Sequence, residues 1–95
     1  MVSKIYKKIP NSLRKYRRIQ KLSQKEVAHF LSLKSTGRIS LWENGECLPS
    51  LVNAIRLATL YRTMVDGLFG DLMKTLRDEV IEKEHKVSEE KSSNP

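Results

Sequence analysis

Two short helix-forming segments joined by a tight turn constrain the fold of this chain more than any other feature. Ser23 and Glu26 have the spacing of a capping box, in which each side chain bonds the backbone amide of the other residue, and this starts a helix near Gln24. Apolar residues then recur at one-turn spacing at three positions: Val27, Ala28 and Leu31. The first segment is therefore predicted to be a short amphipathic helix that ends near Leu31.

A second short helix is expected after a turn over residues 32–34. Ser35 is an N-cap candidate, Ile39 and Trp42 lie one turn apart, and Gly45 provides a left-handed stop. The second segment thus begins with small polar residues and Arg38. This arrangement is typical of a helix-turn-helix, in which the second helix enters the major groove of DNA.

With these motifs in place, the stretch from Leu13 to Phe69 resembles the lambda-repressor-like helix-turn-helix family, also called the Xre or Cro type. The matching residues are Arg17, 22–28, 39–45, 49–51 and 65–69. The resemblance implies a compact all-α domain of five helices that binds double-stranded DNA and regulates transcription, most often as a repressor. The chain departs from the family at Ser32, where a turn glycine is usual, and has one extra residue between Ala28 and Glu43, which we place at Lys34.

The whole chain is predicted to be all-α, because no alternating strand pattern and no internal repeat is present. We divide it into a basic N-terminal arm (1–10), the helix-turn-helix domain (11–70), an additional C-terminal helix with a possible dimerisation role (71–87) and a disordered tail (88–95). Asn11, Ser50 and Thr63 are cap candidates for the first, fourth and fifth helices. The fourth helix is expected to face inward with Leu51, Ala54, Ile55, Ala58 and Tyr61.

Charge is unevenly distributed along the chain, whose formal net charge is +7. Residues 1–25 hold nine lysines or arginines and no acid, whereas residues 78–90 hold six acids and two lysines. A basic end of this kind favours a polyanionic partner, although a general solubilising coat is the simpler alternative. No segment is apolar enough for a membrane span or a secretory signal, so a cytoplasmic, bacterial or phage-like protein is expected, with no membrane partner. The lone Cys47 is expected to have no redox or zinc-binding role.

The residues expected to contact DNA bases project from the second helix of the motif, away from Ile39 and Trp42. They are Thr36, Gly37, Arg38, Ser40 and Leu41. Arg38 can bond guanine in a bidentate manner or grip a phosphate, and these two alternatives stay open. Gly37 suits either a close approach of backbone to DNA or a neutral helix start.

Phosphate contacts are expected around the start of the preceding helix, whose free amides attract anions. The candidates are Gln24, Lys25, Lys34, Ser35 and Asn44. Gln24 resembles the backbone anchor of the family. Lys4, Lys7 and Lys8 of the arm either follow the duplex or belong to an unstructured terminus.

Two further positions receive a structural role from the resemblance. Arg17 and Glu43 correspond to a partly buried ion pair that is common in the family, with phosphate contact by Arg17 as the alternative. Trp42 is expected in the core rather than stacked on nucleic acid, because it lies one turn from Ile39.

Neither histidine, His29 nor His85, has a catalytic partner nearby in sequence, and there is no phosphate loop or metal-ligand spacing. We therefore predict no enzyme activity, catalytic residue, metal, cofactor or small-molecule ligand. Leu72, Leu76 and Val80 recur every fourth residue in a helix expected to reach about Lys86. That stripe packs back on the domain or pairs with a second copy, and we prefer a homodimer that reads two half-sites about 34 Å apart. The alternative function is a protein-interaction module, such as an antitoxin or a transcriptional bridging factor.

Overall fold

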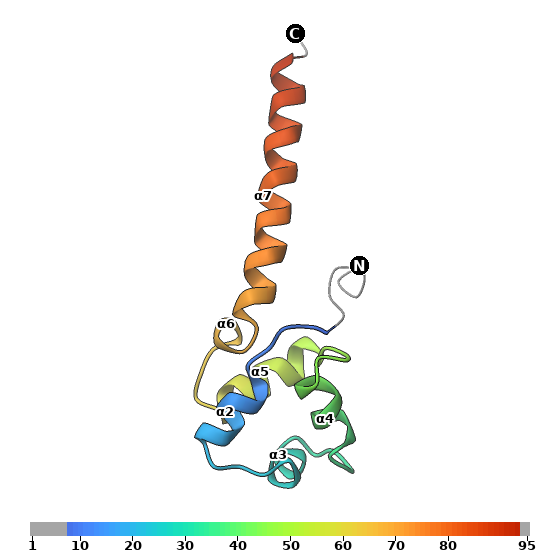
Figure 1. Ribbon diagram of the computed structural model, residues 1–95, viewed down its shortest axis with the longest axis vertical. Helices are drawn as coiled ribbons and strands as arrows, with labels where there is room; N and C mark the ends of the chain where they lie inside the picture. The colour runs from blue at the N-terminus through green and yellow to red at the C-terminus, as the bar shows by residue number, and fades with distance from the viewer. Residues whose placement is uncertain (1–7, 94–95) are drawn as a thin grey trace.

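The computed structural model describes residues 8–93 of the 95-residue chain, and it contains six α-helices and no strand within that range. They are α2 (Leu13–Ile19), α3 (Gln24–Phe30), α4 (Gly37–Glu43), α5 (Leu51–Leu60), α6 (Val65–Leu68) and α7 (Gly70–Ser93). Helices α2–α6 form a compact head, and α7 projects from it as a single long rod (Figure 1). The all-α class is confirmed, with a five-helix head followed by one additional helix.

The core of the head takes at least one deeply buried side chain from each of α2–α6 or its cap. The largest of these are Tyr61, Leu13, Ile39, Leu57, Leu68 and Val27, each no more than 2% exposed. Leu72 from the first turn of α7 closes the core. Each such side chain contributes about 1.5–3 kcal/mol by leaving water, so the short helices are stabilised by packing rather than by their own length.

Two of the helix starts have the expected caps. The Ser23 hydroxyl accepts from the Glu26 amide while the Glu26 carboxylate accepts from the Ser23 amide, which completes the capping box. Ser50 accepts from the Asn53 amide. At α2 the N-cap is Ser12, which makes no side-chain cap bond, so the prediction of Asn11 was wrong by one position, although the Asn11 side chain accepts from the Leu13 amide. The polar residues before these helices therefore satisfy amides that the helices leave unpaired.

Two other expected caps are corrected by the structure. Helix α6 begins after Met64 and has no side-chain cap, so the prediction for Thr63 was wrong. Helix α4 has Thr36 as its N-cap, and Ser35 instead accepts a bond of 3.3 Å from the Gly37 amide.

Four consecutive helices end in the same reverse turn, a Schellman motif with one left-handed residue. After α4 this residue is Gly45, as expected, with φ of 73°. After α2, α3 and α5 it is a residue with a side chain: Lys21, Ser32 and Arg62 have φ of 58°, 57° and 55°. The amide of the left-handed residue and the next amide bond carbonyls of the last helical turn in each case. Ser32 thus adopts the conformation that the family usually gives to glycine.

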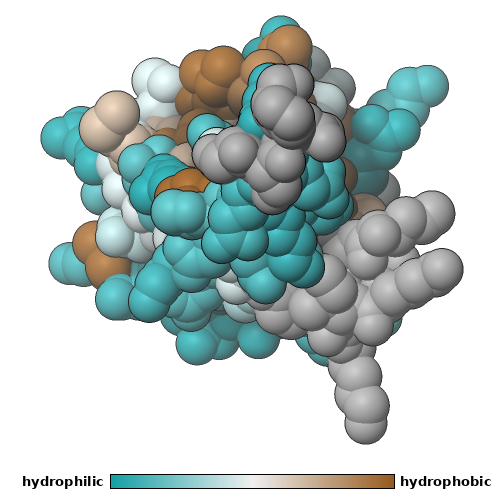
Figure 2. All heavy atoms as spheres, turned by 90° about the horizontal axis from the view of Figure 1, so that it is seen from above, coloured by the Kyte–Doolittle hydropathy of each residue, from teal (hydrophilic) through white to brown (hydrophobic). Residues whose placement is uncertain are grey.

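The inward face of α5 differs from the expected one. Ala54, Leu57, Ala58 and Tyr61 are buried, whereas Leu51 is 72% exposed and Ile55 is 51% exposed. Leu48 and Val52 are also exposed. Figure 2, a view down α7, likewise shows hydrophobic residues gathered at one edge of a largely hydrophilic surface. The prediction is therefore right for Ala54, Ala58 and Tyr61 and wrong for Leu51 and Ile55, and Leu57 is buried in addition. Since α5 is apolar at most positions, its pattern alone fits more than one inward face.

The end of the predicted basic arm is packed on the head. The Ile9 amide bonds the Gly45 carbonyl at 2.8 Å, the Asn11 side chain donates to the Trp42 carbonyl at 3.1 Å, and the Ser12 amide bonds the Leu68 carbonyl at 2.8 Å. Lys8 is exposed and lies 3.9 Å from Glu46. Lys4 and Lys7 lie outside the described residues. Residues 8–10 are therefore part of the folded head rather than a loose arm.

Helix α7 is longer than expected. It continues to Ser93, so residues 88–93, which we expected to be disordered, are helical. The segment from 71 to 93 contains neither glycine nor proline and is rich in Glu and Lys, which have high helix propensity. Among the described residues, no helix combines the length and apolar character needed to cross a bilayer.

Candidate nucleic-acid interface

Helix α4 has a buried side and an outward side. Ile39, Trp42 and Glu43 face the core, with Trp42 only 5% exposed, so the indole fills the head as expected. The five residues predicted to contact bases lie on the other side or at the helix start. Gly37, Arg38 and Leu41 are exposed, and Thr36 and Ser40 are half-buried. Helix α4 therefore presents a short row of mixed polar and apolar side chains to a ligand.

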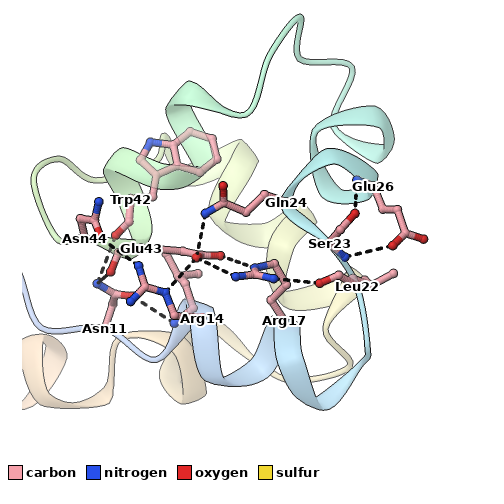
Figure 3. Close-up of polar contacts among 11 residues, drawn as sticks. Asn11, Arg14, Arg17, Leu22, Ser23, Gln24, Glu26, Trp42, Glu43 and Asn44 are labelled. Carbon is pink, nitrogen blue, oxygen red and sulfur yellow. Dashed lines mark hydrogen bonds and ion pairs between the residues drawn. The ribbon is translucent and has the colours of Figure 1, made fainter.

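The buried end of α4 is fixed by a network around the Glu43 carboxylate, whose side chain is 1% exposed (Figure 3). Arg17 of α2 approaches it in a bidentate manner, with Nε 2.6 Å from Oε2 and Nη2 3.1 Å from Oε1. Arg14 Nε and Gln24 Nε2 add bonds to Oε1 of 3.3 and 3.1 Å. Arg17 also donates to the Leu22 carbonyl at 2.9 Å. One carboxylate thus joins α2, α3 and α4, and Arg17 has a structural role.

Electrostatics keep this carboxylate ionised. Burial alone would raise the pKa of Glu43, but hydrogen bonds from Arg17 and Gln24 and the positive charge of Arg17 lower it below the ordinary glutamate value. The pKa of Arg17 is raised by its hydrogen bond to Glu43, against the effect of burial. The pair is therefore fully charged at neutral pH.

Gln24 lies at the first position of α3, where the predicted phosphate anchor is expected. Its side chain is half-buried and turned toward Glu43 rather than away from the head (Figure 3). The carboxamide nitrogen carries two hydrogens, so the bond to Glu43 leaves a second donor. The structure thus gives Gln24 a role in the core network that the sequence did not indicate.

Arg14 is the site residue that sequence reasoning missed. It is exposed, and besides its bond to Glu43 it donates from Nη2 to the Asn44 Oδ1 atom at 2.8 Å. The missed signal is its spacing, because Arg14 precedes Arg17 by three residues and so lies on the same side of α2. Asn44, a predicted phosphate contact, is therefore held by its oxygen, which leaves its amide hydrogens as the donors available to a ligand.

The turn between α3 and α4 forms a concave, basic surface. One hollow of about 390 Å³ is lined by Ser32, Leu33, Lys34, Ser35 and Arg38. A neighbouring hollow of about 380 Å³ includes Lys25, His29 and Thr36 and shares the residues 33–35. Lys25, Lys34 and Ser35, all predicted to contact phosphate, are exposed here. The structure thus brings these three residues together with Arg38.

Gly37 is the first residue of α4 rather than an interior residue, and it is exposed. A Cβ atom at this position would meet only Ser35 Oγ, at 3.5 Å, and the backbone φ is not positive. Of the two roles considered for this glycine, the neutral helix start accounts for its local structure.

A capped helix, a tight turn and a second helix whose outward side is free define the class of helix-turn-helix DNA-binding domains. A helix-turn-helix family model matches residues 13–67, which is more than half of the chain. The chain therefore belongs to the lambda-repressor-like helix-turn-helix family, and this membership makes it a DNA-binding protein of the transcription-regulator type. Comparisons with curated proteins and with solved structures gave no match.

Proposed function

We propose that this chain is a sequence-specific transcriptional repressor that binds double-stranded DNA as a homodimer and reads the major groove with α4. The observation that carries the proposal is the division of α4 between a core side, anchored by Ile39 and Glu43, and an outward side with Arg38 and Leu41. A helix held rigidly at its buried end can present its outward side chains in fixed positions, which sequence recognition requires.

In this proposal the outward residues of α4 provide specificity. Arg38 bonds the acceptors of a guanine, and Leu41, 42% exposed, packs on a thymine methyl group. Thr36 and Ser40 add hydroxyl groups near the same base edges. A good bidentate contact discriminates by about 1–3 kcal/mol, which is about 5- to 150-fold in affinity.

Contacts to phosphate come from the surface around the α3–α4 turn. Lys25 and Lys34 are exposed there and no ion pair of theirs is found among the described residues. Ser35, the second hydrogen of Gln24 and the amide of Asn44 extend the contact along the strand. These bonds set the position of the domain on DNA, while the α4 contacts choose the sequence. The proposal involves no catalysis, metal or cofactor.

The test is selection from random duplex DNA with the purified protein at about 0.15 M salt, where binding to phosphates alone is weakened. We expect enrichment of one inverted repeat. The variant Arg38→Ala should lose about 5- to 150-fold in affinity for that site but little for random DNA. Lys74→Ala, which removes one positive charge from the exposed side of α7, serves as the control for net charge.

Three results would count against parts of the proposal. A uniform loss with Arg38→Ala on all sequences, with a salt slope reduced by about 0.9, would make Arg38 a phosphate contact. Failure to enrich any sequence, with the fold intact, would favour a protein-interaction module such as an antitoxin or bridging factor. Enrichment of a site whose occupancy raises transcription of a linked reporter would exclude repression.

A further inference from the structure

Beyond its first turns, α7 stands clear of the head (Figure 1). Four of its six apolar residues nevertheless form a regular stripe, whereas Leu72 is buried in the head and Ile81 lies off the stripe. Met73, Leu76, Val80 and Val87 follow the alternating spacing of three and four residues found in coiled coils, with Lys83 at the position between the two valines. Val80 is 59% and Val87 47% exposed. The stripe therefore begins against the core of the head and continues into solvent.

A hollow follows this stripe on the exposed part of α7. It measures about 410 Å³ and is lined by Val80, Lys83, Glu84 and Val87, then Ser88 and Lys91. The first four residues have the spacing i, i+3, i+4 and i+7, which is the set that surrounds one hole in knobs-into-holes packing. The exposed face of α7 thus has an open hollow whose lining has the spacing of such a hole.

We propose that this occupant is α7 of a second copy of the chain, running antiparallel, with Val87 packed against Leu76 of the second copy. In this register Val80 faces Lys83 of the second copy, and Gly70 lies opposite Ser93. The overlap lies mainly along the exposed part of α7 from Val80 onward, because Leu72, Met73 and Leu76 in the first turns pack on the core of the head. The inference deepens the homodimer part of the proposed function by giving the interface and the orientation of the two chains.

Charge complementarity decides the orientation. In an antiparallel pair, the residues that flank the stripe face each other so that Arg77 lies against Glu84 of the second copy and Glu79 lies against Lys86. Because the dimer has two-fold symmetry, each of these attractive pairs occurs twice. A parallel pair in register would instead bring Glu79 against Glu84 and Lys86 against Lys91. Every flanking charge pair is therefore attractive in one orientation and repulsive in the other.

One existing contact competes with this arrangement. Lys86 lies 4.0 Å from Glu82 in the same helix, with both side chains more than 70% exposed. An exposed pair of this kind is weak and its members remain free to exchange partners. Lys83 is the only polar residue within the stripe between Met73 and Val87. Because it faces the apolar Val80 of the second copy, it weakens the helix pair. Lys83→Leu should therefore lower the dimer dissociation constant at least tenfold.

Thiol cross-linking of the full chain without DNA tests the orientation. In a Cys47→Ser background, Leu76→Cys with Val87→Cys should cross-link two chains rapidly through a short thiol cross-linker. Val87→Cys alone should not, because the two thiols would be eleven positions, roughly 16 Å, apart along the helix. Cross-linking of the single variant would establish a parallel pair and overturn the proposal, as would a chain that sedimentation shows to be monomeric at all concentrations.

Charge reversal tests the same interface independently. Arg77→Glu should raise the dimer dissociation constant about tenfold at about 0.05 M salt, where surface charges are weakly screened, and adding Glu84→Arg should restore it. Lys74→Glu makes the same charge change on the exposed opposite side of α7 and should have little effect. If Arg77→Glu and Lys74→Glu changed the dissociation constant equally, the interface would lie elsewhere, such as at the exposed apolar residues of α5. Because neither test uses DNA, a failed DNA selection would leave this inference standing, and a failed cross-link would leave DNA recognition standing.

Discussion

Replacing Glu43 with alanine should destabilise the head more than any other single loss of charge. The change removes a carboxylate that accepts four hydrogen bonds, and it leaves the guanidinium of Arg17, whose side chain is only 12% exposed, without its partner. Breaking a buried pair from one side costs about 3–5 kcal/mol, because the remaining charge stays desolvated. For a domain of this size the melting temperature should fall by about 10 °C or more.

Urea unfolding followed by tryptophan fluorescence measures this cost directly. Trp42 is the only tryptophan of the chain and is buried beside Glu43, so its emission reports loss of the head. The control is Glu46→Ala, the same substitution three residues further on. Glu46 is half-exposed and lies 3.9 Å from Lys8, and such a surface pair is worth about 0–1 kcal/mol.

A double-mutant cycle with Arg17→Ala completes the measurement. The two residues are in direct contact, so the double variant should be more stable than the sum of the single losses indicates, by about 0.5–3 kcal/mol. Arg14→Ala should cost less than Arg17→Ala, because the Arg14 side chain is 44% exposed and water replaces its contacts. If Glu43→Ala lowered the free energy of unfolding by less than about 1 kcal/mol, as little as the control does, the view that this network anchors α4 would be refuted.

Five other substitutions have expected outcomes. The pKa of Glu43 is lowered in the folded state, so its ionised carboxylate stabilises the fold above the ordinary glutamate pKa of about 4.3, and this stabilisation is lost as pH falls through the lowered pKa. Glu43→Gln should therefore make the free energy of unfolding, measured in urea, less dependent on pH on the acid side. Ser32→Gly should raise the free energy of unfolding by up to about 1 kcal/mol, since it relieves a left-handed residue, and an unchanged urea midpoint would contradict this. Gly45→Ala should lower the thermal midpoint strongly, because φ is 73° and a Cβ atom would lie 2.9 Å from the Ile9 nitrogen, whereas Gly37→Ala should leave it unchanged or higher. Tyr61→Phe should leave stability unchanged or raise it by about 1 kcal/mol by calorimetry, because the buried hydroxyl has no hydrogen-bond partner among the described residues.

Local signals in the sequence were sufficient to place most of the head. The Ser23 and Ser50 caps and the Gly45 stop depend on backbone groups a few residues away, so they can be read from short stretches of sequence. The contact between Arg17 and Glu43 spans 26 positions, and only the resemblance to a family indicated it. The structure contains this ion pair, and the family match covers both residues.

The wrong predictions concern features that depend on distant parts of the chain. Leu51 and Ile55 were expected in the core because α5 is apolar on several sides, and only the packing of the rest of the head decides which side is buried. The orientation of Gln24 depends on where Glu43 lies, nineteen positions away. The end of α7 was placed too early because acidic and basic residues suggested a disordered tail, although the same residues have high helix propensity.

If α4 reads DNA as proposed, the network around Glu43 links the stability of the head to that reading. Helix α4 has seven residues, about two turns, so its direction depends strongly on what holds its last turn. Arg17 ties that turn to α2, and Gln24 ties it to the start of α3, where phosphate contacts are proposed. If Gln24 turned fully toward a phosphate, Glu43 would lose one bond, at a cost of about 1 kcal/mol. If it used only its second hydrogen, both contacts would persist, and binding to DNA would strengthen the link between α3 and α4. The latter arrangement would keep the two helices in one fixed relation, so Arg17 and Glu43, which are not among the proposed DNA contacts, would set how accurately α4 is presented to DNA.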